Sequence, residues 1–209
     1  MRTNNKVKFG LKNVHFALLT ETRQEDNTIK TTYDTIEPWP GGVSMSMDPS
    51  GENVTFYADN REYVELPGNA GYEGDFESAL IPEKVYTHVY GQDKVKGAIV
   101  ESNNPTPKYI ALLFEFDGDA TATRYIFYKC SLTRAAVSST TTEDSKEVQT
   151  ETVTIKAMPR ADAVKINGED RYLVKAFSTP DMSDEIYNKW YSQIFDPSDT
   201  DDSSTEPQG

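Results

Sequence analysis

The sequence predicts a mainly β fold with two packed antiparallel sheets, arranged as a sandwich or half-barrel, with one short flanking helix and a C-terminal helix. Hydrophobic residues make up only 36% of the 209 residues, but aromatic residues reach 11%, a composition typical of half-buried strands. Disordered chains are poor in aromatic residues, so the composition indicates a folded chain. Apolar and polar residues alternate over short stretches, and Gly, Pro, Asn and Asp separate these stretches, as in antiparallel sheets.

The first half of the chain contains an apolar strand at residues 14–21 and then two predicted hairpins. Residues 42–58 hold two β-like runs on either side of Asp48-Pro-Ser-Gly, whose residues favour a turn. Residues 62–81 hold two more runs around a loop at 67–71, which is rich in residues that tolerate positive φ. We therefore expect two consecutive hairpins here.

A short helix is predicted at residues 83–90. Pro82 suits its first position, and Gly91 follows its end. Its apolar residues share one stripe, which we expect to cover an open end or edge of the sheets; they are Val85, Tyr86, Val89 and Tyr90.

Five further strands are predicted in the second half, at residues 95–101, 108–116, 123–133, 148–157 and 171–177. In the second of them Ile110, Leu112, Phe114 and Phe116 share one face, and Ala111, Leu113 and Glu115 share the other. In the fourth, Val153, Ile155 and Ala157 alternate with Thr152, Thr154 and Lys156. A tight turn is predicted after Phe116, and a polar hairpin loop at residues 138–148.

A C-terminal helix is predicted after Ser183, which suits the N-cap, and Pro197 ends it. Its apolar stripe can dock on its own subunit or on a neighbouring one; the residues are Ile186, Tyr187, Trp190, Tyr191 and Ile194. The chain therefore divides into a basic N-terminal arm at 1–12, a β domain at 13–180, and a helix with an acidic flexible tail at 181–209. The charged ends are either solvated termini or arms that reach neighbouring copies.

The residues give no catalytic, cofactor-binding or metal-binding constellation. The chain has two histidines, His15 and His88, and one cysteine, Cys130, which are too few for a zinc site of Cys and His ligands. Cys130 alternates with Tyr128 and Ile126, so we expect it to be a small buried apolar side chain. An enzyme is therefore not expected, and neither is a cofactor, although a hydrolase that uses only carboxylates stays open.

The net charge and the lengths of the apolar runs limit the kinds of partner that we expect for the chain. A net charge of −13 argues against nucleic acid as a tightly bound partner, because phosphate contacts need clustered Lys and Arg. No run of eighteen apolar residues is present, so we expect no membrane span. The first ten residues lack the apolar stretch of a secretory signal, and a lone cysteine forms no internal disulfide. We therefore expect folding in a reducing cytoplasm.

Three blocks, taken in order, resemble the major tail proteins of long-tailed, non-contractile phages of Gram-positive bacteria. The blocks are the opening Lys6-Val-Lys-Phe-Gly-Leu-Lys-Asn-Val-His-Phe-Ala-Leu-Leu-Thr, the middle block at 56–60 and 68–83 with the helix that ends at Gly91, and Thr152-Val-Thr-Ile-Lys-Ala-Met-Pro-Arg160. The resemblance covers roughly residues 5–160, and the stretch after about Asp181 matches less clearly.

The resemblance implies a structural virion protein that polymerises as stacked hexameric rings to form the tail tube. The tube surrounds the tape measure protein, meets tail terminator and distal tail proteins at its ends, and conducts DNA without binding it specifically. Such a subunit is assembled in the cytoplasm of the host bacterium and belongs to the tail of the virion. A ring requires a head-to-tail interface that closes after a fixed rotation.

Two groups of candidate residues follow from this role. An acidic wall repels DNA, so we expect carboxylates on strands to face the lumen, with Glu73, Asp75, Glu77 and Glu115 as candidates. Ordinary solvent-facing alternation explains any single one of them equally well. We expect the 42–58 hairpin and the basic arm to stack one ring on the next, with Lys6, Lys8, Lys12, Met45, Met47 and Asp48 as candidates.

Two other functions stay open. A carbohydrate-binding β-sandwich would stack sugar rings on exposed Trp39, Tyr33 or Trp190. Another tail or capsid structural protein of related fold, such as a tail terminator or a capsid decoration protein, would share the composition and the lack of a catalytic site.

Overall fold

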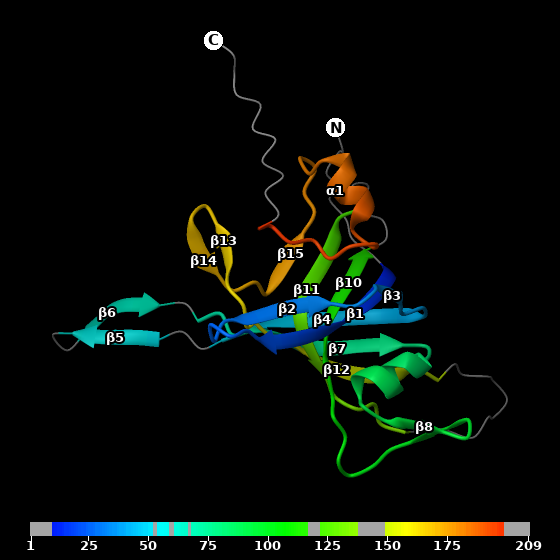
Figure 1. The fold of residues 1–209 in the computed structure, drawn as a ribbon. Helices are drawn as coiled ribbons and strands as arrows, with labels where there is room; N and C mark the ends of the chain where they lie inside the picture. The colour runs from blue at the N-terminus through cyan, green and yellow to red at the C-terminus, as the bar shows by residue number, and fades with distance from the viewer. Residues whose placement is uncertain are drawn as a thin grey trace.

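The computed structural model describes residues 10–51, 54–58, 61–66, 68–116, 122–137 and 149–198. Over these residues the chain forms fifteen strands, one π-helix, η1 (Val85–Val89), and one α-helix, α1 (Asp184–Lys189), as Figure 1 shows. Neither of these helices is long and apolar enough to cross a membrane. The prediction of a mainly β, antiparallel fold with a short flanking helix and a C-terminal helix is confirmed.

One nine-stranded antiparallel sheet forms the body of the molecule. Its main path is β2 (Ile29–Tyr33), β1 (Leu11–Arg23), β10 (Tyr109–Phe116), β11 (Arg124–Leu132), β12 (Glu151–Ala157), β7 (Gly71–Ser78) and β4 (Gly42–Ser50). Off this path, β3 (Glu37–Pro38) pairs with β1, and β15 (Lys175–Phe177) pairs with β11.

Three two-stranded hairpins are added to this sheet. They are β5 (Val54–Ala58) with β6 (Arg61–Leu66), β8 (Asp93–Val95) with β9 (Ala98–Val100), and β13 (Val164–Ile166) with β14 (Glu169–Arg171). The β5–β6 hairpin extends away from the body of the sheet, and the β8–β9 hairpin lies on the side of η1 (Figure 1). An isolated two-stranded hairpin is marginally stable in water, so these three depend on what they join or contact.

The sheet curls around an inner core because its bulky apolar residues alternate toward one face. Trp39 lies at its centre and is 1% exposed. Its ring meets Phe16 of β1 at 5.8 Å and Phe76 of β7 at 5.1 Å, both edge to face, and its Nε1 donates to Ser78 Oγ at 3.1 Å. A Cβ added to Gly42 of β4 would lie 3.0 Å from Val14 of β1, so the two ends of the curled sheet approach each other here.

The helix η1 covers the inner core as the apolar stripe at 83–90 predicts. Val85 and Val89 are buried in this core, and Tyr90 is buried beside them. Glu151 fixes the approach to the helix, because its carboxylate accepts from the Ile81 N–H at 2.7 Å. Tyr90 also donates its hydroxyl to the Thr133 carbonyl at 2.8 Å, which ties the helix to the chain just after β11.

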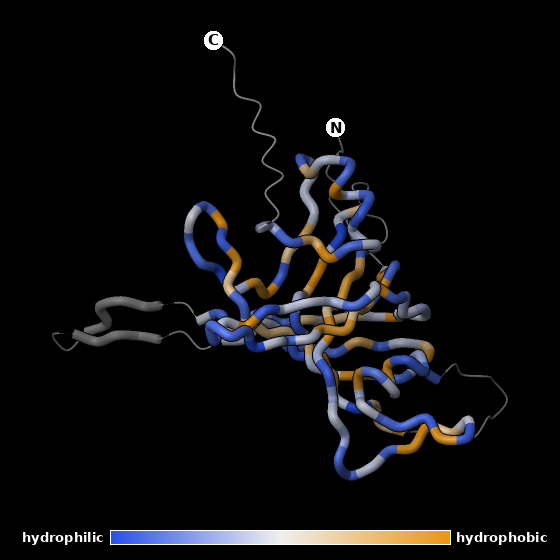
Figure 2. Tube along the Cα trace, viewed as in Figure 1, coloured by the Kyte–Doolittle hydropathy of each residue, from blue (hydrophilic) through white to orange (hydrophobic). Residues whose placement is uncertain are grey.

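The outer face of the sheet is apolar over β1, β10 and β11, and the C-terminal segment covers it. Trp190, at the C-cap of α1, is 1% exposed and packs in a second core with Ala17, Ala111, Leu113, Ile126 and Tyr128. The predicted N-cap is confirmed, since Ser183 Oγ accepts from the Ile186 N–H at 3.3 Å. The helix therefore docks on its own subunit. Figure 2 shows apolar residues concentrated along β10 and β11, the strands between these two cores.

Both predicted hairpins in the first half are wrong. Strand β4 pairs with β7, and β5 pairs with β6, so residues 42–78 form one long interrupted ribbon. Asp48-Pro-Ser forms the end of β4 because Ser50 pairs with Gly71 and continues the ladder. An outer strand tolerates turn-favouring residues such as proline. The long-range pairing of β4 with β7 therefore determines the structure here, and the local preference for a turn does not.

Two strands predicted in the second half are also interrupted. Residues 95–101 turn back at Lys96 and Gly97, which both have positive φ, so that Val95 faces Ala98. Residues 171–177 are divided between β14, which ends at Arg171, and β15, which begins at Lys175. The tight turn predicted after Phe116 and the loop predicted at 138–148 lie outside the described residues.

Candidate functional site

The outer face of β4, β7 and β12 is polar, and no described element packs over it. The register aligns side chains across the three strands: Glu77 lies opposite Ser44 and Thr152, Asp75 opposite Ser46 and Thr154, and Glu73 opposite Asp48 and Lys156. We call these nine residues the acidic face. It carries four carboxylates and one ammonium group, and seven of the nine residues are exposed; Glu77 and Thr154 are half-buried.

Strict alternation along β7 creates this face. Phe76 and Ser78 point inward and are buried, while Glu73 and Asp75 point outward. Gly74 brings β7 close to β4, since a Cβ at this position would lie 1.8 Å from the Ser46 carbonyl oxygen. The structure therefore brings together three of the four residues predicted to face a lumen.

Hydroxyl groups donate hydrogen bonds to two of these carboxylates. Glu77 accepts from Ser44 Oγ at 2.9 Å and from Thr150 Oγ1 at 2.6 Å, one donor on each carboxylate oxygen. Asp75 accepts from Thr154 Oγ1 at 2.8 Å. The hydrogen bonds from Thr150 and Ser44 favour the ionised form and hold the pKa of Glu77 below its usual value.

Glu115, the fourth predicted lumen residue, does not belong to this face. It is 3% exposed and lies beneath the C-terminal segment. Its Oε1 accepts from Asn13 Nδ2 at 2.6 Å, and its Oε2 lies 3.5 Å from Arg124 Nε, directly opposite on β11. Tyr191 donates to the same carboxylate at 3.3 Å. Glu115 is therefore an internal ion-pair partner, and the prediction that it faces a lumen is wrong.

The predicted ring-stacking residues are scattered. Lys6 and Lys8 lie outside the described residues. Lys12 is exposed, and its Nζ lies 3.6 Å from Glu115 Oε1. Met45 and Met47 of β4 are half-buried against the inner core, because they alternate with the polar residues of that strand. Asp48 belongs to the acidic face, so β4 does not present these three residues as one stacking surface.

A buried arginine that the sequence did not single out anchors the C-terminal segment. Arg160, 4% exposed, donates through Nε and NH2 to Asp162 at 2.9 and 2.6 Å, and through NH1 to Asp196 at 3.1 Å. Asp162 also accepts from Thr31 Oγ1 at 2.5 Å. Burial alone would raise the pKa of Asp162, but the hydrogen bonds from Arg160 and Thr31 lower it to about 2.

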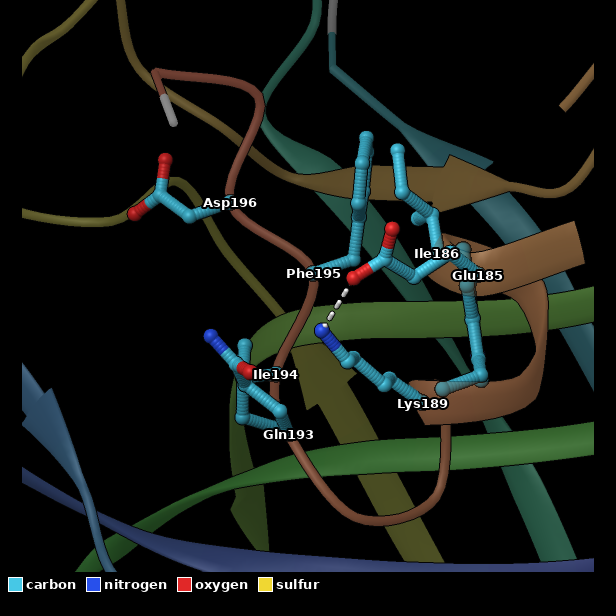
Figure 3. Close-up of a pocket in the computed structure, with 8 residues that line it drawn as sticks. Glu185, Ile186, Lys189, Gln193, Ile194, Phe195 and Asp196 are labelled. Carbon is cyan, nitrogen blue, oxygen red and sulfur yellow. Dashed lines mark hydrogen bonds and ion pairs between the residues drawn. The ribbon is translucent and has the colours of Figure 1, made fainter. Parts of the chain in front are cut away.

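A small hollow lies between α1 and the segment that follows it (Figure 3). Its volume is about 100 Å³. Ile194 and Phe195 form part of its wall, and the Phe195 ring stacks on Trp190 at 5.4 Å. Lys189 and Glu185 form an ion pair at its rim, with a distance of 2.7 Å between Nζ and Oε1. These contacts belong to the docking of α1.

The cysteine and the two histidines lie apart from one another. Cys130 is fully buried, as predicted, and burial raises the pKa of its thiol. It lies in the inner core, whereas Tyr128 and Ile126, with which it alternates in the sequence, lie in the outer core, because the pairing of β10 with β11 is irregular between Ile110 and Leu112. His15 lies against Tyr191 in a tilted arrangement with ring centroids 4.6 Å apart, and His88 is exposed on η1. Among the described residues no group of three or more His, Cys, Asp or Glu is placed to hold a metal ion.

Two of the three aromatic residues named for a carbohydrate-binding surface are buried. Trp39 and Trp190 are each 1% exposed, within the inner and outer cores. Tyr33 is half-buried, and its hydroxyl donates to the Tyr128 carbonyl at 3.0 Å. Trp39 and Trp190 therefore present no free ring face to a sugar.

Exposed apolar side chains occur on the β8–β9 hairpin. Val95, Ile99 and Val100 are all exposed there, and Figure 2 shows hydrophobic residues among hydrophilic ones along this hairpin. Leu80, just after β7, is also exposed. Sequence alternation could not distinguish these residues from buried ones, because the hairpin projects from the sheet.

Comparison with known proteins identifies no family. No protein-family model matches the chain, and a search of curated proteins returned no match. Among solved structures, one match is a chain in the cryo-EM structure of the baseplate of the anti-feeding prophage. It has a TM-score of 0.36 and 9% identity, over 86% of this chain and 99% of that chain. A likeness at this TM-score assigns neither a fold family nor a function.

Proposed function

We propose that this chain is the tail-tube subunit of a long-tailed, non-contractile phage and polymerises as stacked hexameric rings that conduct DNA to the host. The acidic face is the observation that carries the proposal. It places Glu73, Asp75 and Glu77 on one bare surface with Asp48 beside them, and a single lysine. In the ring this face lines the lumen.

The charge of the face suits a surface that DNA must pass without binding. Duplex DNA carries a negative charge about every 1.7 Å along its axis, so a basic wall would hold the genome through released counterions. A wall of fixed carboxylates repels DNA within a Debye length of about 8 Å at physiological salt. The Ser and Thr hydroxyls between the carboxylates keep the face hydrated without adding positive charge.

Assembly into rings accounts for surfaces that a monomer leaves exposed. The exposed Val95, Ile99 and Val100 suit contacts between subunits, which are enriched in apolar residues at their centre. The basic arm at 1–12 suits the stacking of rings through acidic neighbours. The partners in the virion tail are then further copies of the chain, the tape measure protein inside the tube, and tail terminator and distal tail proteins at its ends.

Electron microscopy of the concentrated purified protein tests whether the chain polymerises into tubes. The expected result is tubes with a central channel, and removal of residues 1–12 should yield rings or monomers instead. A capsid decoration protein or a tail terminator would not form such tubes. Monodisperse monomers at every concentration, even with the other tail proteins present, would contradict the proposal.

Charge reversal tests whether the acidic face lines the lumen of the tube. Asp75→Lys changes an exposed residue of the acidic face, and Glu25→Lys makes the same kind of change on the exposed turn between β1 and β2. The first should slow or block DNA ejection from otherwise intact particles, and the second should leave ejection unchanged. Equal ejection rates in the two variants would remove the acidic face from the lumen.

A further inference from the structure

Glu77 is held more firmly than a surface carboxylate usually is. Its two donors come from different strands, because Ser44 lies on β4 and Thr150 immediately precedes β12. Each donor takes a different oxygen of the carboxylate, at 2.9 and 2.6 Å. The carboxylate therefore bridges the neighbouring chain segments on both sides of β7, and its rotation is fixed.

Asp75 is held in the same manner one step along the strand. Thr154 stands opposite it in the register and donates Oγ1 at 2.8 Å. The backbone N–H of Thr154 donates in turn to Thr133 Oγ1 at 3.0 Å, so the donor is itself anchored to the segment after β11. Two consecutive outward carboxylates of β7 thus have hydroxyl donors on adjacent segments.

We propose that Ser44, Thr150 and Thr154 are positioning residues, whose hydroxyls keep the Glu77 and Asp75 carboxylates fixed on the acidic face. This rests on the proposed function, and it explains why the face contains Ser and Thr between its acids. A hydroxyl group donates a hydrogen bond to a carboxylate oxygen and leaves the negative charge in place, whereas a lysine ammonium group would neutralise that charge. The face thereby stays negative and rigid at the same time.

The consequence is that Glu77 keeps its negative charge at a lower pH than a carboxylate without these donors. Donation to the ionised form lowers the pKa of a carboxylate, and the pKa of Glu77 is lowered by Thr150 and Ser44. The other charged groups on this face are Asp75 and Glu73 on β7, Asp48 on β4 and Lys156 on β12. The neighbouring carboxylates act in the opposite sense, because like charges favour protonation, and Lys156 lies at the Glu73 end.

Side-chain carboxyl chemical shifts followed by NMR against pH test the proposal on the unassembled chain. Thr150→Val combined with Ser44→Ala should raise the pKa of Glu77, since both stabilising donors are lost. Thr150→Ser keeps a hydroxyl and should restore most of the wild-type value. Thr152→Val is the matched control: Thr152 lies opposite Glu77, and within the described chain it makes no hydrogen bond to it.

The outcomes separate this inference from the proposed function. A Glu77 pKa that is unchanged in the double variant, or that moves equally in Thr152→Val, would overturn the role of the hydroxyls whether or not tubes form. If the pKa rises as expected, the double variant should form tubes and lose DNA ejection at a higher pH than the wild type. Failure of wild-type tubes would contradict the proposed function and leave the titration result standing.

Discussion

Replacement of Trp190 by alanine should release the C-terminal segment from the outer face of the sheet. The side chain is 1% exposed and lies against Ala17, Leu113 and Ile126. Truncation of a buried tryptophan to alanine costs about 3–5 kcal/mol, because contacts are lost and a cavity remains. For a domain of this size each kcal/mol lowers Tm by about 2–4 °C, so we expect Tm to fall by about 6–20 °C.

Thermal unfolding followed by circular dichroism measures the loss, and limited proteolysis locates it. The loop between β15 and α1 should become the first site of cleavage, since Trp190 is the only fully buried anchor on the described residues after it. Ile186→Ala is the matched control on the same helix: Ile186 is 38% exposed, and we expect a cost below about 1 kcal/mol. Equal stability of the two variants would refute the assignment of α1 as a segment anchored by Trp190.

Three further perturbations test the sheet, the core and the arginine cluster. Gly74→Ala should lower the free energy of unfolding in urea by about 1–3 kcal/mol or more, because the new Cβ would lie 1.8 Å from the Ser46 carbonyl oxygen. An unchanged urea midpoint would contradict the close approach of β4 and β7. Cys130 should resist alkylation in the native state and react only on unfolding, as mass spectrometry can follow; rapid native labelling would refute its burial. Asp162 has a pKa lowered from 3.8 to about 2, so its contribution is complete above pH 4 and is lost as the pH falls toward 2. The Tm difference between wild type and Asp162→Asn should therefore shrink over this interval, and a constant difference would exclude the ion pair with Arg160 as its source.

Local periodicity predicted which side chains share a face in β10 and β12, but not in β11, where Cys130 lies in the inner core and Tyr128 and Ile126 in the outer core. The alternation in residues 108–116 and 148–157 separates the inner core from the outer face as observed, with Leu112 and Ile155 buried inside and Thr154 pointing outward. The three β7 residues of the acidic face could be predicted for the same reason, because Glu73, Asp75 and Glu77 alternate with inward residues.

Pairing partners could not be predicted, because they depend on contacts far apart in the chain. The turn residues after Asp48 are compatible with both a hairpin and the end of a strand, and only the pairing of β4 with β7 decides between them. The burial of Glu115 could not be predicted either, because it also depends on a contact far along the chain. Its periodicity places it on the outer face, but whether that part of the face is bare depends on Tyr191, 76 residues later, which donates to its carboxylate. Asn167-Gly168 is different, since this dipeptide is a strong hairpin signal and could have predicted the β13–β14 turn.

The position of β4 at the end of the main sheet has a consequence for the solubility of the free subunit. A terminal strand exposes a row of backbone donors and acceptors that can template aggregation with any extended chain. In β4 the ladder is irregular between Gly42 and Ser44, and Pro49 has no N–H to offer. Only a short central stretch can accept another strand, so indiscriminate growth into fibres is disfavoured while a partner of matching register is still accommodated.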